Sequence, residues 1–99
     1  MLYYSFLKQE RDKKSELWVR RSGQLWPVFD YKIKGDFISL ISDPDVSIAE
    51  AVTLEELIEY VGEEGCSFNV PYQIIDELTG QDLDIKDRFS HKLVFEICN

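Results

Sequence analysis

The chain has few of the residues from which catalytic and metal sites are usually built. It contains one histidine, His91, and two cysteines, Cys66 and Cys98, and neither CxxC nor HExxH occurs. No glycine pattern matches a phosphate-binding loop, and no apolar run approaches the ~20 residues of a membrane-spanning helix. We therefore expect a cytoplasmic protein with reduced cysteines and without catalytic residues, cofactor, metal or membrane span.

Two weak signals for chemistry remain. Asp82, Asp84 and Asp87 begin like a calcium-binding loop, but the glycine expected at position six and the closing glutamate are absent. His91 would form a nucleophilic pair with a cysteine if the fold brought the two together. Single candidates of this kind are typical of ordinary surface residues, so a small enzyme is only the third functional hypothesis.

What the sequence does have is enough apolar material for one core. Its 99 residues are 44% hydrophobic and 13% aromatic, which is richer than is typical of disordered chains. A chain of this length buries about 60–65% of the surface that its unfolded form exposes. We predict a single domain over residues 1–99.

Alternating apolar residues predict strands in the first half of the chain. We assign these strands to residues 2–8, 16–22, 24–34 and 37–41. Ser22-Gly23 and Gly35-Asp36 are turn signals between neighbouring strands. Within 24–34, strict alternation places Phe29 and Tyr31 on one face and Val28 on the other. Together the four segments predict an antiparallel meander.

One helix has clear start and stop signals. Thr53 suits the N-cap, and Glu56 three residues later completes a capping box. Apolar side chains then recur at helical spacing from Leu54 to Val61. Gly62 and Gly65 are suited to the helix end. We predict a helix over 53–63.

Residues 70–79 allow two structures. Pro71 suits a first helical position, Ile74, Ile75 and Leu78 form a stripe, and Gly80 suits the position after a helix. We favour a helix; the alternative is a strand that leads into a hairpin at Thr79-Gly80.

Residues 92–98 alternate and predict a final strand. The resulting fold class is α+β: a mostly antiparallel sheet, made of an N-terminal four-stranded meander plus a C-terminal strand, with one or two helices packed on one face.

Charge is distributed unevenly along the chain. Residues 51–99 hold three Lys or Arg and eleven Asp or Glu, so they account for the whole net charge of −8. No Lys, Arg or His occurs between Lys34 and Lys86. Glu55, Glu59 and Glu63 follow at i,i+4 spacing on the predicted helix, where like charges cost a few tenths of a kcal/mol per pair. A surface selected for stability alone would place lysines among them.

This pattern predicts an acidic face that docks on a basic protein. One-signed surfaces accelerate encounter with partners of opposite charge and repel nucleic acid directly. The size and charge are similar to those of bacterial toxin-immunity proteins and phage-encoded inhibitors, which implies a non-enzymatic inhibitor that blocks a nuclease toxin or another nucleic-acid-processing enzyme. The candidate partner-binding residues are Glu55, Glu56, Glu59, Glu63, Asp76, Glu77, Asp82 and Asp84.

The alternative is a non-catalytic adaptor or oligomerisation module. In that case a sheet edge and exposed aromatic side chains would select the partner, and the acidic face would serve only to keep the protein soluble. The oligomeric state is open under both hypotheses.

Overall fold

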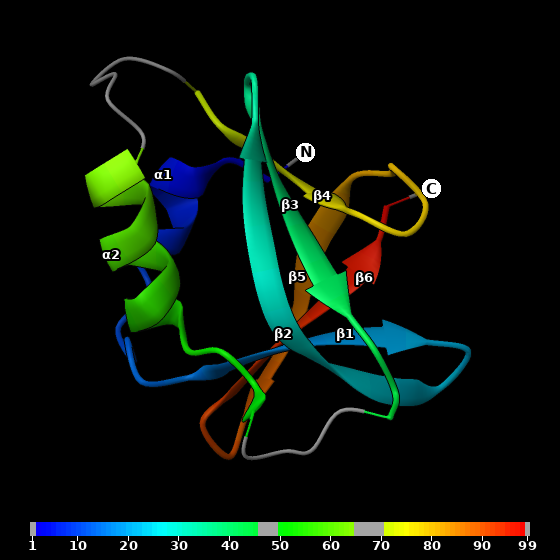
Figure 1. The fold of residues 1–99 in the computed structure, drawn as a ribbon. Coiled ribbons are helices and arrows are strands. Elements are labelled where there is room, and N and C mark those ends of the chain that lie inside the picture. The colour runs from blue at the N-terminus through cyan, green and yellow to red at the C-terminus, as the bar shows by residue number, and fades with distance from the viewer. Residues whose placement is uncertain (1, 46–49, 65–70, 99) are drawn as a thin grey trace.

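The computed structural model describes residues 2–45, 50–64 and 71–98, and the side chains of Glu63 and Glu64 are not described. The fold is α+β, with a six-stranded mixed sheet and two short helices (Figure 1). The elements are α1 (Tyr4–Leu7), β1 (Glu16–Arg21), β2 (Gln24–Lys34), β3 (Phe37–Ser42), α2 (Leu54–Glu64), β4 (Gln73–Asp76), β5 (Leu83–Phe89) and β6 (Lys92–Ile97).

The strands follow the order β4-β3-β2-β1-β6-β5. β1, β2 and β3 form an antiparallel meander, whereas β4 runs parallel to β3 and β6 runs parallel to β1. The long β2 pairs with β1 through its first half and with β3 through its second. A bulge between Val28 and Asp30 bends it, as an extra residue in one strand does. An Ile75–Asp82 bridge then brings the two edge strands together at one point, so the sheet curls toward closure.

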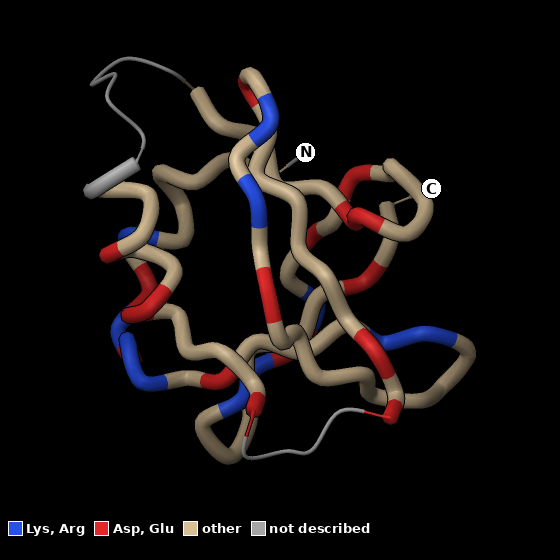
Figure 2. The backbone as a smooth tube through the Cα atoms, viewed as in Figure 1, with Lys and Arg blue, Asp and Glu red and all other residues tan. Residues whose placement is uncertain are grey.

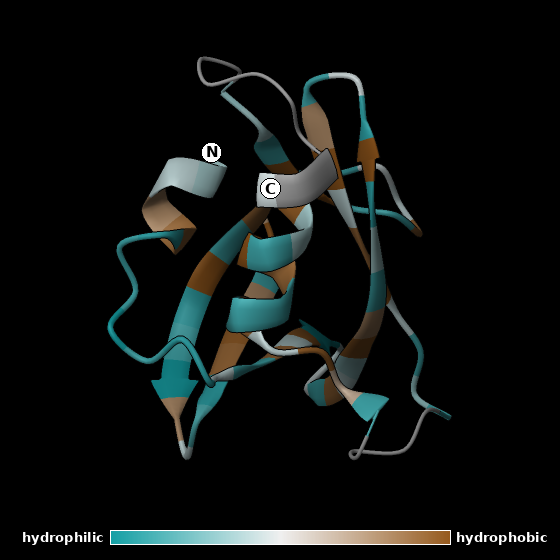
Figure 3. Cartoon of the chain, turned by 60° about the vertical axis from the view of Figure 1, so that its left-hand side comes forward, coloured by the Kyte–Doolittle hydropathy of each residue, from teal (hydrophilic) through white to brown (hydrophobic). Residues whose placement is uncertain are grey.

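One apolar core lies inside this curled sheet. Leu17, Val19 and Phe95 are fully buried there, and α2 covers the core with Leu54 and Leu57. Figure 3 shows the outward side of α2 as mostly hydrophilic, with hydrophobic segments of the sheet behind it. The prediction of a helix at 53–63 is confirmed to within one residue at each end, although the helix continues past Gly62 to Glu64. Gly65 lies outside the described residues.

The first predicted strand, 2–8, is wrong from Tyr4 onward. Leu2 and Tyr3 do lie alongside β4, where extended Tyr3 bridges Gln73 and Ile74 N donates to Leu2 O at 2.8 Å. The chain then turns into α1, which buries Leu7 completely and leaves Phe6 52% exposed. The burial of Leu7 in the core thus outweighs the alternating pattern of apolar residues that predicted a strand. The meander therefore has three strands, and the sheet is mixed: β1–β2, β2–β3 and β5–β6 pair antiparallel, whereas β1–β6 and β3–β4 pair parallel.

The helix favoured for 70–79 is also wrong. Within the described part of that range, Gln73–Asp76 forms β4, and a turn leads on to Gly80. Ile74 is buried, whereas Leu78 is 68% exposed, which a helical stripe would not allow. Pairing with the edge of β3 decides the structure, because tertiary context overrides weak local propensity. The strands predicted at 16–22, 24–34, 37–41 and 92–98 are confirmed to within a residue or two.

Candidate protein-binding surface

The N-terminus of α2 is fixed by backbone and side-chain acceptors. Leu54 N donates to Ser15 O at 2.9 Å, and Glu55 N donates to Lys13 O at 2.8 Å. Glu56 N donates to Thr53 Oγ1 at 3.2 Å, so Thr53 is the cap that the sequence predicts. The first amide groups, which helices usually leave without partners, are therefore satisfied within the protein and do not form an anion site.

Two tyrosines hold α2 from its flanks. Tyr4 Oη donates to Ile58 O at 3.3 Å, and Tyr31 Oη of β2 donates to Glu56 O at 3.4 Å. The rings of Tyr31 and Tyr60 meet edge to face, with centroids 4.8 Å apart, a geometry that aromatic pairs prefer. The orientation of α2 relative to β2 is therefore fixed by aromatic contacts as well as by the core.

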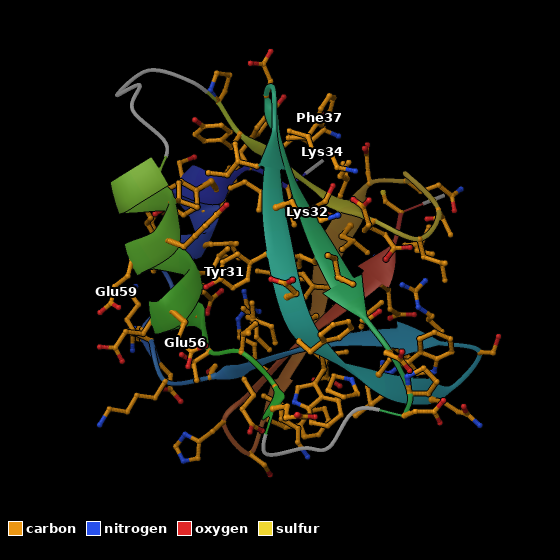
Figure 4. The ribbon with its side chains drawn as sticks, in the orientation of Figure 1. Tyr31, Lys32, Lys34, Phe37, Glu56 and Glu59 are labelled. Carbon is orange, nitrogen blue, oxygen red and sulfur yellow. The ribbon has the colours of Figure 1, made fainter. Side chains whose placement is uncertain are left out.

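Tyr31 lies in the negative field of nearby carboxylates. Burial raises the pKa of Tyr31, and the negative charges of Glu56, Asp30 and Glu59 raise this pKa further. Figure 4 shows Tyr31 between α2 and β2, with Glu56 on α2 near it and Glu59 on the outer side of α2. We call this patch the α2–β2 surface, and its residues are Asp30, Tyr31, Glu55, Glu56, Glu59 and Tyr60.

The eight acidic residues predicted to bind a partner do not form one face. Glu55, Glu56 and Glu59 are exposed on α2, as expected. Figure 2 shows acidic residues on α2 and others on the far side of β2, where β4 leads into β5. The side chain of Glu63 lies outside the described part of the protein.

Asp76 and Glu77 are both engaged within the protein. Asp76 is completely buried and pairs with Arg21, so it is not available to a partner. Glu77 is 2.6 Å from Lys34 Nζ, and this lysine lowers the pKa of the Glu77 carboxyl. The segment between Lys34 and Lys86 contains no basic residue, but the fold pairs two of its carboxylates with Arg21 and Lys34.

Asp82 and Asp84 flank the start of β5, away from α2. Asp82 accepts a hydrogen bond from Gln73 Nε2. Asp84 is half-buried, interacts with Cys98 and raises the pKa of that thiol. Neither residue belongs to the α2–β2 surface.

Basic residues border this surface at one end. The backbone of Lys13 contacts the N-terminus of α2, and Figure 2 shows basic residues beside that end of the helix. The Lys13 ammonium group is turned back onto the backbone oxygens of Lys8 and Glu10. It therefore does not pair with the glutamates of α2.

Sequence reasoning missed three members of the surface. Tyr31 and Asp30 belong to β2, and no local signal connects that strand with α2. Tyr60 follows Glu56 at i,i+4 spacing, so the helical pattern could have placed it at the border between the apolar and acidic faces. The missing information was the packing of α2 beside β2.

The fold separates His91 from Cys98. The extended β6 lies between the two residues and holds them about 20 Å apart at the usual rise per residue. His91 Nδ1 is 2.7 Å from Asp12 Oδ2, and this contact lowers the pKa of Asp12. His91 and Cys98 therefore do not form a nucleophilic pair. Cys66 is not among the described residues.

Within residues 2–45, 50–64 and 71–98, no group of three or more His, Cys, Asp or Glu is arranged to hold a metal ion. None of the helices in these ranges has the length and apolar character needed to cross a membrane. The comparisons found no family model, curated protein or solved structure that matches the chain.

The glutamates of the α2–β2 surface should contribute to the raised pKa of Tyr31. Replacing Glu56 and Glu59 with Gln should lower the pKa of Tyr31, yet leave it above the ordinary value because burial persists. Since folding raises this pKa, the contribution of Tyr31 to stability is present below about pH 10 and is lost as the pH rises through the folded-state pKa. Ultraviolet absorbance titration of the wild-type chain and of the double Gln variant measures the shift. The titration curve of the same protein carrying Tyr31→Phe is subtracted from each, so that only the signal of Tyr31 remains. The control Asp45→Asn should leave the pKa of Tyr31 unchanged. An unchanged pKa of Tyr31 in the double Gln variant would contradict the claim that Glu56 and Glu59 raise it.

Proposed function

We propose that the chain is a small inhibitory binding protein of the immunity type. It docks through the α2–β2 surface on the basic substrate groove of a nucleic-acid-processing enzyme, such as a nuclease toxin. The supporting observation is that Asp30, Glu55, Glu56 and Glu59 make no ion pair with any described residue. Their charge is therefore available to lysine and arginine side chains of a partner.

The contrast with other acidic residues supports this assignment. Glu10, Asp76 and Glu77 pair with Arg88, Arg21 and Lys34, respectively. Asp30, Glu56 and Glu59 instead lie close enough to the half-buried Tyr31 for their charges to raise its pKa. Tyrosine is enriched at binding hot spots, and arginine stacks on aromatic rings. A basic enzyme surface matches both properties, and occupying it would exclude the phosphates of the substrate.

A second candidate is an adaptor that binds through the outer face of β2, β3 and β4. The strand register places Phe37, Ile41 and Ile75 on this face, and Phe37 is 41% exposed. The sheet edges are less suitable. Leu2 and Tyr3 cover the edge of β4. The other edge strand, β5, is bulged at Lys86 and carries charges of both signs, features that discourage strand addition. In the adaptor hypothesis, the outer face of β2, β3 and β4 is therefore the binding surface, in place of the sheet edge that the sequence suggested.

Salt-resolved capture tests the proposed function. The immobilised chain should retain, from a lysate of its native host, a basic nucleic-acid-processing enzyme that is released as salt screens the charged contact. Adding the free chain to this enzyme should inhibit its activity, with weaker inhibition at high salt. An enzyme that binds and remains fully active, or one that salt does not release, would contradict the proposal.

A further inference from the structure

A cleft lies between the N-terminal segment and the β5–β6 hairpin. Its volume is about 840 Å³, within the range of small-molecule sites. The residues that line it include Leu2, Phe6, Arg11, Phe89 and Leu93. None of these belongs to the α2–β2 surface, so the cleft is independent of the proposed function.

Two polar contacts hold the walls of the cleft together. The Arg88 guanidinium donates to Glu10 through Nε at 3.0 Å and through Nη2 at 2.6 Å. His91 contacts Asp12 at 2.7 Å, and Glu16 N donates to His91 O at 2.7 Å. The N-terminal wall and the hairpin wall of the cleft are therefore linked at several points. A cleft that is already ordered before a ligand binds loses less conformational entropy on binding.

Most residues of the lining are polar or charged, and the apolar ones include both buried and exposed side chains. Leu2 and Leu93 are buried at 6% and 1% exposure, whereas Phe6 and Phe89 are 52% and 40% exposed. Exposed rings beside buried apolar side chains are suited to an aryl or branched alkyl group.

The charged groups of the lining differ in what engages them. Glu10 and Asp12 pair with Arg88 and His91, Asp84 interacts with Cys98, and the Lys92 ammonium lies 5.1 Å from the ring centroid of Trp18. Arg11 is exposed and makes no ion pair or hydrogen bond with any residue in the described ranges. A guanidinium in this state is suited to bind a carboxylate through two parallel hydrogen bonds.

We propose that this cleft binds an amphipathic carboxylate. The apolar group of the ligand lies on Leu2 and Leu93 between the two phenylalanine rings, and its carboxylate accepts hydrogen bonds from Arg11. A free aryl or alkyl acid has this chemistry, and so does the C-terminus of a peptide that ends in an apolar residue.

Titration followed by amide NMR shifts tests the proposal. The probes are 3-phenylpropionate and the peptide N-acetyl-Gly-Gly-Phe, each compared with its uncharged amide. Both acids should shift residues of the cleft, and each should bind about tenfold more tightly than its amide, as expected for a charge-assisted contact. Tighter binding of the peptide would identify a protein C-terminus as the ligand, whereas equal or tighter binding of the small acid would identify a free acid.

Matched variants separate the carboxylate contact from general charge. Arg11→Gln should weaken binding of both acids about tenfold. Lys14→Gln removes the same charge from an exposed neighbour outside the lining and should have little effect. Equal effects of the two variants, equal binding of acids and amides, no binding of either acid, or shifts confined to residues outside the cleft would each overturn the proposal.

Discussion

Asp76→Ala should lower the free energy of unfolding by about 3–5 kcal/mol, the cost of leaving one partner of a buried ion pair uncompensated. Asp76 is fully buried, and the Arg21 side chain is only 11% exposed. The Asp76 carboxylate accepts hydrogen bonds from both terminal guanidinium nitrogens of Arg21 and from the amide and hydroxyl of Thr79. These contacts join the end of β1 to the turn after β4, so their loss should affect the whole fold. Urea denaturation measures the change.

The neighbouring residue supplies the control for this prediction. Glu77→Ala also removes an acid from an ion pair, but its partner Lys34 is half exposed. Such pairs contribute about 1 kcal/mol or less. Similar costs for Asp76→Ala and Glu77→Ala would contradict the structural role assigned to Asp76. Replacing the buried pair together, as Arg21→Met with Asp76→Leu, should recover much of the lost stability.

Glu59→Lys should change stability and binding in opposite directions. It converts the Glu55–Glu59 repulsion into an attractive i,i+4 pair, which should stabilise α2 by about 0.5 kcal/mol. The same lysine would face the basic surface of the proposed partner, where a like-charge contact costs several kcal/mol. Affinity for the captured enzyme should therefore fall by about two orders of magnitude. Thermal unfolding and titration calorimetry measure the two effects.

Asp45→Lys is the matched control for the charge reversal. Asp45 is exposed and lies outside the α2–β2 surface, and its replacement changes the net charge by the same amount. It should slow association only slightly, through the long-range field, and leave dissociation nearly unchanged. If both reversals weaken binding equally, net charge rather than this surface controls recognition.

The sequence predicted elements well where the local signal was strong. The cap at Thr53 and the apolar spacing that follows it defined α2, and alternation defined most of β2. The bulge was not predictable: it resets the alternation, so Val28 is buried while Phe29 is 37% exposed. A single extra residue in a strand has no clear local signature, because the twist of the folded sheet decides where it lies.

The candidate site shows how an error in secondary structure becomes an error in function. A helix with an Ile74, Ile75 and Leu78 stripe would place Asp76 and Glu77 together on the polar face. The strand that actually forms turns Asp76 inward to Arg21 and leaves Glu77 partly exposed. The charge asymmetry was visible in the sequence, but which carboxylates remain unpaired depends on contacts between distant elements.

The footprint of the captured partner on this chain tests the central claim most directly. Amide hydrogen exchange should be measured for the free chain and for the complex. We predict that protection on binding concentrates in α2 and around Tyr31 in β2, with little change in the outward-facing residues of β3 and β4. Protection centred on Phe37 and β4, with α2 exchanging as in the free chain, would contradict the α2–β2 surface and support the adaptor instead.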